Sequence, residues 1–223
     1  MSLVMTVFMV VPILAPLIGQ TVLNFFHIWQ STFGILAIGG AIMLVWSHLR
    51  MPETRPPEKR TSIAPKAIFE AYATVFKTRL ALGYMLASGV IFGALFAFIS
   101  SSEQIFNDIF QTPETFVFWF AGIAAAMSVA NFTNSRIVEK FGQRVISHAA
   151  MIGFTFFSVV LLIVTHVFGP NLYVFMFFFT LVFMNFGFMG PNFNSMAMEP
   201  LGHVAGLAAA IFSAFSTLVS LPL

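Results

Sequence analysis

Six polar side chains lie inside otherwise apolar stretches of this 223-residue chain, and their types suit the binding of a small molecule. Amide and hydroxyl groups are costly in such stretches, so they usually face the interior of a helix bundle or a hydrated cavity. There they can bind the polar part of a ligand, or they can simply bond one helix to another. The six residues are Gln20, Ser128, Asn131, Asn185, Asn192 and Asn194.

Aromatic side chains could supply the walls of such a cavity. Trp119, Phe186 and Phe193 each neighbour small or polar residues. The chain holds 30 Phe and 13 Met, and aromatic faces and flexible thioethers accept ligands of varied shape. Most of these residues must instead face lipid or the core. The sequence contains no nucleophile–base pair and no phosphate-binding loop, so we expect a binding protein and no enzyme.

Charged residues gather between two apolar stretches, in the segment that reads SRIVEKFGQR. Here Glu139, Lys140 and Arg144 place an acid and two bases where two helix ends should meet. They could pair with one another or with the helix ends, and so hold one conformation of a moving bundle. The alternative is a plain basic loop that obeys the charge rule for membrane proteins.

Glu103 ends another apolar stretch, directly after three serines. One interpretation is an acid that handles protons in a hydrated mouth. The other is an ordinary loop carboxylate, because Asp108 and Glu114 follow in the same loop. Both interpretations stay open for Glu103.

Composition places these residues in a membrane. The chain is 59% hydrophobic and only 8% charged, with a mean hydropathy of +0.93, whereas a soluble domain is about 25% charged. This excludes a soluble enzyme, a nucleic-acid binder and a disordered chain. Cysteine is absent and the five His are scattered, so neither a metal site nor a cofactor is expected. The expected fold class is an all-α polytopic membrane protein in a lipid bilayer.

Seven transmembrane helices are predicted from apolar runs of about 20 residues, long enough to cross a bilayer. The runs are too long and uniform for a β-barrel, and the first lacks the basic start of a signal peptide. Their ranges are 3–23, 31–49, 80–102, 113–134, 146–168, 172–194 and 204–223. Between the second and third runs lies a Pro-rich hydrophilic linker. After Pro65 it predicts a short amphipathic helix with Ile68, Tyr72 and Phe76 on one face.

The basic residues predict the orientation of the chain, because all of them fall in two loops. These are Arg50, Arg55, Lys59, Arg60, Lys66, Lys77 and Arg79 in the first, and Arg136, Lys140 and Arg144 in the second. The positive-inside rule places both loops and the N-terminus in the cytoplasm, and the C-terminus outside. Rhodopsins and G-protein-coupled receptors have the opposite orientation. A retinal protein also needs a lysine in its last helix, and no lysine follows Lys140.

Small residues repeat every four positions along two predicted helices, which favours close helix packing or sliding. Gly89 and Gly93 lie in the third helix. Gly202, Gly206 and Ala210 lie at the start of the last one.

The first predicted helix should bend, because Pro12 and Pro16 remove backbone donors in its middle. Its segment APLIGQ, from Ala15 to Gln20, resembles the Gly-Pro-x-x-Gly-Gly antiporter motif in helix five of major facilitator drug:proton antiporters. Pro16 and Gly19 match the motif, whereas Ala15 and Gln20 stand where it has Gly.

The segment SRIVEKFGQR resembles the G-x-L-x-D-R-x-G-R-R loop that recurs between helices eight and nine of the same superfamily. Gly142 and Arg144 match it, Glu139 and Lys140 keep its charges, and Ser135 replaces its first Gly. Two shorter segments add to the resemblance: PET after the second helix, and MEPLGHVAG before the last. The second of these looks like the start of helix eleven in the bicyclomycin-resistance (Bcr/CflA) family.

The resemblance covers essentially the whole chain, aligned as helices five to eleven of twelve, and implies a partial major facilitator fold. Residues 1–50 would hold the last two helices of the N-terminal half and residues 51–79 the cytoplasmic central loop. Residues 80–223 would hold the first five helices of the C-terminal half. We therefore expect a fragment, whose partner is the missing helices of the same carrier.

The resemblance further implies a secondary active transporter of the bacterial inner membrane, which exports drugs by proton antiport with alternating access. Protons and a small-molecule drug or metabolite would be its partners, and no nucleic acid. Relatives of this type also handle purine or nucleobase-type metabolites, which form the alternative substrate class. The alternative from another class is a non-transporting membrane scaffold or a degenerate transporter remnant.

Overall fold

The computed structural model describes residues 14, 18–52 and 65–221, and the regular structure in these residues is entirely helical. Residues 18–26 form a helix that precedes α2. The long helices are α2 (Gln30–Arg50), α4 (Arg79–Gln104), α5 (Phe116–Phe141), α6 (Gln143–Phe168) and α7 (Leu172–Met198). The shorter elements are α3 (Pro65–Lys77), η2 (Ile105–Ile109), η3 (Pro113–Thr115), η4 (Glu199–Val204) and α8 (Ala205–Ser220).

Five helices in the described part of the chain are long and apolar enough to cross a membrane, which confirms the second to sixth predicted spans. In the last predicted span, helix α8 covers the 16 residues Ala205–Ser220, and residues 222–223 lie outside the described residues. The first predicted span lies mostly outside the described residues.

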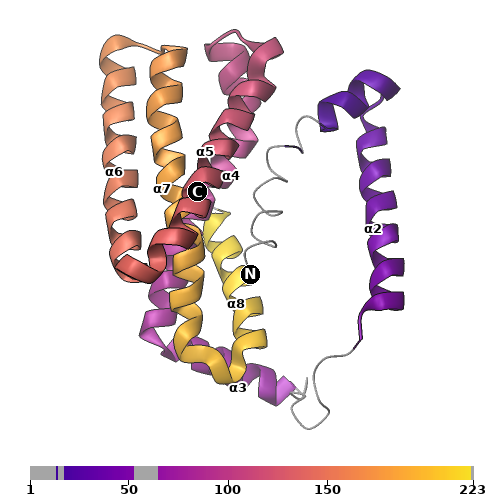
Figure 1. Ribbon diagram of the computed structural model, residues 1–223, viewed down its shortest axis with the longest axis vertical. Coiled ribbons are helices and arrows are strands. Elements are labelled where there is room, and N and C mark those ends of the chain that lie inside the picture. Colours follow the sequence, from indigo (N-terminus) through magenta and orange to yellow (C-terminus); the bar gives the residue numbers. More distant parts are fainter. Residues whose placement is uncertain (1–13, 15–17, 53–64, 222–223) are drawn as a thin grey trace.

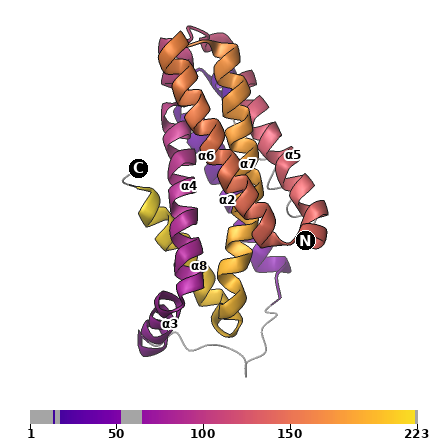
Figure 2. The same cartoon turned by 90° about the vertical axis from the view of Figure 1, so that its left-hand side faces the viewer.

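Helix α7 lies at the centre of the bundle and packs against α4, α5 and α6 (Figures 1 and 2). Tilted and edge-to-face ring pairs join it to α4. The ring centroids of Phe92 and Phe186 are 5.6 Å apart, and those of Phe98 and Phe183 are 5.2 Å apart. Residues later in α4 contact residues earlier in α7, so the two helices are antiparallel. Offset aromatic pairs of this kind stabilise a core beyond their burial.

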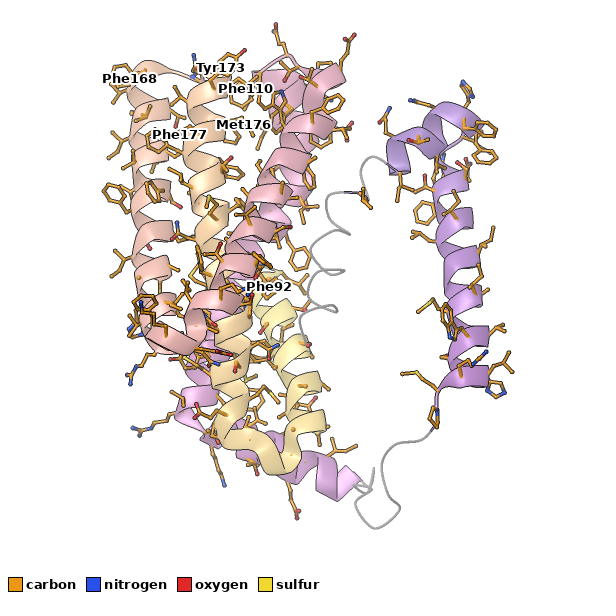
Figure 3. The ribbon with its side chains drawn as sticks, viewed as in Figure 1. Phe92, Phe110, Phe168, Tyr173, Met176 and Phe177 are labelled. Atoms are coloured by element: carbon orange, nitrogen blue, oxygen red, sulfur yellow. The ribbon has the colours of Figure 1, made fainter. Side chains whose placement is uncertain are left out.

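Two ends of the bundle differ in chemistry. The end that we call the acidic end carries Glu103, Asp108 and Glu114. Exposed aromatic side chains lie there too, and Figure 3 shows Phe168 and Tyr173 together at the top of α6 and α7. Aromatic rings at one level are typical of the membrane–water interface. The other end, which we call the basic end, carries Lys77 and Arg79 where α3 meets α4, and Lys140 and Arg144 where α5 meets α6.

The predicted loop between α5 and α6 is wrong, because the segment Ser135 to Arg144 is helical on both sides of one residue. Lys, Arg and Glu are good helix formers, so α5 continues for two turns beyond its apolar part. Gly142 then has φ +79° and ψ 146°, a conformation that essentially only glycine adopts. The chain therefore turns from α5 into α6 at a single glycine.

Helix α3 lies across the base of the bundle, roughly perpendicular to α4 in Figure 1. It confirms the predicted short helix after Pro65. Val75 is fully buried there, in a second apolar cluster with Ala81, Met85 and Leu201. The ring centroids of Phe76 and Phe215 are 5.2 Å apart, in edge-to-face contact. α3 is therefore docked on α4 and α8.

Helices α2 and α6 expose most of their apolar surface. α2 has no buried residue and stands apart from α4–α8 in Figure 1. α6 buries Ile146, Ser147 and Ala150 near its start, and then presents large apolar side chains such as Ile152 and Leu162 outward. Such surfaces suit lipid or further helices rather than water.

Candidate functional site

A buried amide pair joins α5 to α7 near the basic end. Asn134 Nδ2 donates to Asn192 Oδ1 at 3.2 Å, and Asn192 Nδ2 donates back to Asn134 Oδ1 at 2.9 Å. The same Asn192 nitrogen lies 3.0 Å from the Phe188 carbonyl oxygen. Both side chains are buried. Asn192 was a predicted site residue, whereas its partner Asn134 was missed, although its three-residue spacing from Asn131 hinted at a polar helix face.

Two buried serines lie at the same level of α7. Gln143 bonds to Ser195 and Gly153 lies against Asn185, so the antiparallel register places Ser147 of α6 opposite Pro191. The ring pairs Tyr84–Phe193 and Phe92–Phe186 likewise place Ser88 of α4 opposite Met189. The hydroxyls of Ser88 and Ser147 have no hydrogen-bond partner among the described residues. We call Ser88, Asn134, Ser147 and Asn192 the polar layer.

Pro191 interrupts the backbone hydrogen bonds of α7 at the level of the polar layer. It lies inside α7, and without an N–H it leaves the Gly187 carbonyl without its helical donor. A helix is weakest at such a point, and nearby hydroxyls can re-satisfy the freed backbone group. The layer thus surrounds the weakest turn of the central helix with groups able to exchange hydrogen bonds.

Two glycines let α7 approach its neighbours above this layer. A Cβ on Gly187 would lie 2.7 Å from the Met127 carbonyl oxygen of α5. A Cβ on Gly153 of α6 would lie 2.5 Å from Asn185 Oδ1. Asn185 also donates to the Leu181 carbonyl at 2.8 Å. The predicted residue Asn185 therefore packs over Gly153 between two helices.

An open cavity of about 680 Å³ lies below the layer, at the basic end. Arg144 of the charged motif lines it, and Gln143 donates to Ser195 Oγ at 3.0 Å in its wall. The full lining is Leu80, Tyr84, Gln143, Arg144, Ser195, Met196, Met198 and Glu199. The lining thus combines a cation, an anion, an aromatic ring and two thioethers. Tyr84 and Glu199 were not predicted, because they lie far from the motif in sequence.

The other motif residues face different surroundings. Glu139 is exposed, and Lys140 Nζ lies 5.2 Å from the ring centroid of Phe141. Ser135 Oγ donates to the Phe132 carbonyl at 2.7 Å. The structure therefore brings Arg144 alone of these charges into the cavity wall.

Several predicted residues lie away from the polar layer and the cavity. Ser128 donates to the Ala124 carbonyl of its own helix at 2.9 Å, and Asn131 is half-buried on the next turn. Asn194 is exposed. Trp119 Nε1 donates to Thr115 Oγ1 at 3.0 Å near the acidic end.

The predicted residues outside the bundle core are more exposed. Gln20 Nε2 donates to Asn24 Oδ1 at 3.2 Å, and a Cβ on Gly19 would meet nothing within 4 Å. Glu103 is exposed in the last turn of α4. Pro12 and Pro16 lie outside the described residues. Among the described residues, no group of three or more His, Asp or Glu is placed to hold a metal ion.

The small-residue stripes have two different outcomes. Gly89 and Gly93 are buried, and a Cβ on Gly89 would lie 2.6 Å from Val219 Cβ, so α4 and α8 do approach closely there. The stripe on the last helix does not pack within the described chain, so the packing predicted for it stays a prediction. Its residues Gly202, Gly206 and Ala210 are exposed. Within the described chain α8 packs through Ala208, Ile211, Phe212 and Ser216, which are buried.

A family model now identifies the chain, because the model described as Major Facilitator Superfamily matches residues 1–222. The chain belongs to the Major Facilitator Superfamily. This agrees with its all-helical, polytopic fold. Membership of this superfamily, together with relatives named as a transporter and as resistance proteins, argues against an enzyme.

Three curated proteins of this superfamily illustrate the similarity. A bicyclomycin resistance protein homolog of Haemophilus influenzae is 32% identical over 152 residues, 68% of this chain and 38% of that protein. The MFS-type transporter YdgK of Bacillus subtilis is 28% identical over 218 residues, 94% of this chain and 52% of that protein. The multidrug resistance protein MdtM of Escherichia coli is 28% identical over 142 residues, 62% and 34% of the two chains.

The chain therefore spans about half the length, or less, of the curated relatives that it matches. No solved structure gives a significant match. The described helices are thus part of a major facilitator fold.

Proposed function

We propose that this chain is part of a proton-driven exporter of drugs and other xenobiotics in the bacterial inner membrane. The observation that carries the proposal is the superfamily match over residues 1–222, with relatives named for bicyclomycin and multidrug resistance. Export would proceed by alternating access, with the N-terminus in the cytoplasm. The positive-inside pattern of the two basic segments supports that orientation.

The polar layer supports a conformational role for α7. Alternating access needs an element with two arrangements of similar free energy. The turn at Pro191 can bend at little cost, because Ser88 and Ser147 offer hydroxyl groups that no described residue uses. We assign the motif residue Arg144 to the closure of the cavity at the basic end. Asn192 of the polar layer is the proposed ligand contact, and Glu103 is the proposed proton-handling acid.

The test is transport in proteoliposomes, under an imposed pH gradient, by a purified carrier that includes these 223 residues. We expect bicyclomycin or a fluorescent cationic drug to move against its gradient, and Asn192→Ala to slow this movement. Asn194→Ala is the matched control, because Asn194 is exposed and should leave transport unchanged. Arg144→Ala should alter the ratio of inward-open to outward-open molecules.

A second candidate function is a non-transporting scaffold or remnant, favoured by the chain's limited span of its relatives. The same transport assay distinguishes this scaffold or remnant from a transporter. If the carrier that includes this chain inserts and folds but moves neither drug nor a nucleobase, and Asn192→Ala changes nothing, the transport proposal is wrong and the scaffold is supported. Export of a purine in place of the drugs would instead identify the alternative substrate class.

A further inference from the structure

The bundle uses only part of the apolar face of α3. Val75 is fully buried against α4 and α8. Phe69, Tyr72 and Phe76 follow the spacing of one helix side, yet their side chains are 76%, 41% and 39% exposed. We call these three residues the aromatic flank. It lies beside Val75 around the helix rather than opposite to it, because each residue turns the helix by about 100°.

The polar residues of α3 lie on the side away from the bundle. Glu70 and Lys77 are exposed and seven positions apart, so they share one edge, roughly opposite Val75 around the helix. Arg79, which begins α4, is exposed two residues after Lys77. Around the helix the order is therefore bundle contact, aromatic flank and charged edge.

The orientation of α3 brings this flank to one level of the membrane. α4 to α7 run along the long axis of the molecule, and α3 crosses their base at the basic end (Figures 1 and 2). If the spans cross the bilayer, the charged edge faces water and the aromatic flank faces sideways, near the headgroups. A helix with Phe on one side and Lys on the other is typical of elements that lie in the interface.

Charge complementarity points to the occupant of this surface. The segment 50–79 holds seven basic residues, Arg50, Arg55, Lys59, Arg60, Lys66, Lys77 and Arg79, against the acids Glu53, Glu58 and Glu70. Basic clusters beside a membrane span attract anionic lipid headgroups. Tyr72 and Phe76 are stacked with ring centroids 6.3 Å apart, which makes a firm aromatic surface for the acyl boundary.

We propose that α3 is an anionic-lipid anchor of the cytoplasmic leaflet. Phe69, Tyr72 and Phe76 insert at the boundary between headgroups and acyl chains, and Lys77 and Arg79 bind lipid phosphates. The choice of leaflet rests on the orientation given under the proposed function, whereas the insertion itself does not depend on transport. The anchor fixes the level of the basic end, and with it the mouth of the cavity lined by Arg144.

The natural absence of cysteine makes a direct depth measurement possible. The chain would carry one spin label, at Phe69→Cys, in nanodiscs of phosphatidylcholine with or without phosphatidylglycerol. The readout is the ratio of collisions with oxygen, which concentrates in lipid, to collisions with a water-soluble nickel chelate. Glu70→Cys is the control for water exposure, and Ile152→Cys on exposed α6 is the control for lipid exposure.

We expect the oxygen-to-nickel ratio at position 69 to exceed that at position 70 several-fold and to fall below that at position 152. Phosphatidylglycerol should raise the ratio at position 69, and Lys77→Gln with Arg79→Gln should remove this rise. A label at position 69 that collides mainly with nickel, or with neither reagent because protein covers it, overturns the insertion. An oxygen-to-nickel ratio at position 69 that is the same with and without phosphatidylglycerol overturns the anionic-lipid binding. Because no drug is moved, failure here is distinct from failure of the transport proposal.

Discussion

At the scale of single residues, the Asn134–Asn192 pair should stabilise the contact between α5 and α7. Replacing either residue by Ala leaves the other amide buried without its partner, which should cost roughly 1–2 kcal/mol. The double variant should cost less than the sum of the two, because it leaves no orphaned amide. Unfolding of the four proteins in detergent gives this coupling directly.

Asn194→Ala serves as the matched control for this cycle, because the side chain is exposed two residues away on the same helix. It should change the unfolding free energy very little. Strictly additive effects of Asn134→Ala and Asn192→Ala would show that the two hydrogen bonds contribute nothing together.

The sequence could predict that Asn192 is special, since an amide in an apolar helix stands out. It could not predict Asn134 as its partner, because pairing depends on the register between helices that are 58 positions apart. Ser88 and Ser147 were missed for a related reason. Serine is common in membrane helices, where it usually bonds to its own backbone, so only burial without a partner distinguishes these two.

At the scale of helices, Gly187 sets how closely α7 approaches α5. The change Gly187→Ala would put a methyl group 2.7 Å from the Met127 carbonyl oxygen and 2.9 Å from Ala130 Cβ. The helices must then separate, and overpacking of this kind costs roughly 1–3 kcal/mol. Thermal unfolding in detergent should show the loss.

Gly190→Ala is the control on the same helix, because a Cβ there would meet nothing within 4 Å. Alanine favours a helix over glycine by up to about 1 kcal/mol, so this variant should be neutral or more stable. Equal destabilisation by both variants would mean that the close approach of α5 and α7 at Gly187 contributes nothing particular to stability.

The helices themselves were largely predictable, because runs of apolar residues long enough to cross a bilayer leave few other interpretations. Their ends were less so. Hydropathy stops near Asn134, whereas α5 continues to Phe141, since charged residues end an apolar run without ending a helix. The exposed stripe of Gly202, Gly206 and Ala210 shows the same limit, because spacing identifies a smooth face and leaves its neighbour undetermined.

At the scale of the whole molecule, the proposed orientation puts the acidic end outside and the basic end in the cytoplasm. Single cysteines can test this, since the chain has none of its own. We expect Glu114→Cys to react with a membrane-impermeant maleimide in intact cells, and Lys140→Cys to react only after the membrane is opened. Both side chains are exposed. The reverse labelling pattern would contradict the positive-inside assignment.

The single-glycine junction at Gly142 has a consequence for proteolysis. Arg136, Lys140 and Arg144 surround it, all exposed, and would each offer trypsin a suitable side chain. A protease nevertheless cuts only where backbone can open and extend into its cleft, which loop tips allow and helices resist. Here helix runs up to the glycine from both directions. The basic end therefore holds several Lys and Arg residues that trypsin recognises, yet its helical backbone should resist cleavage there.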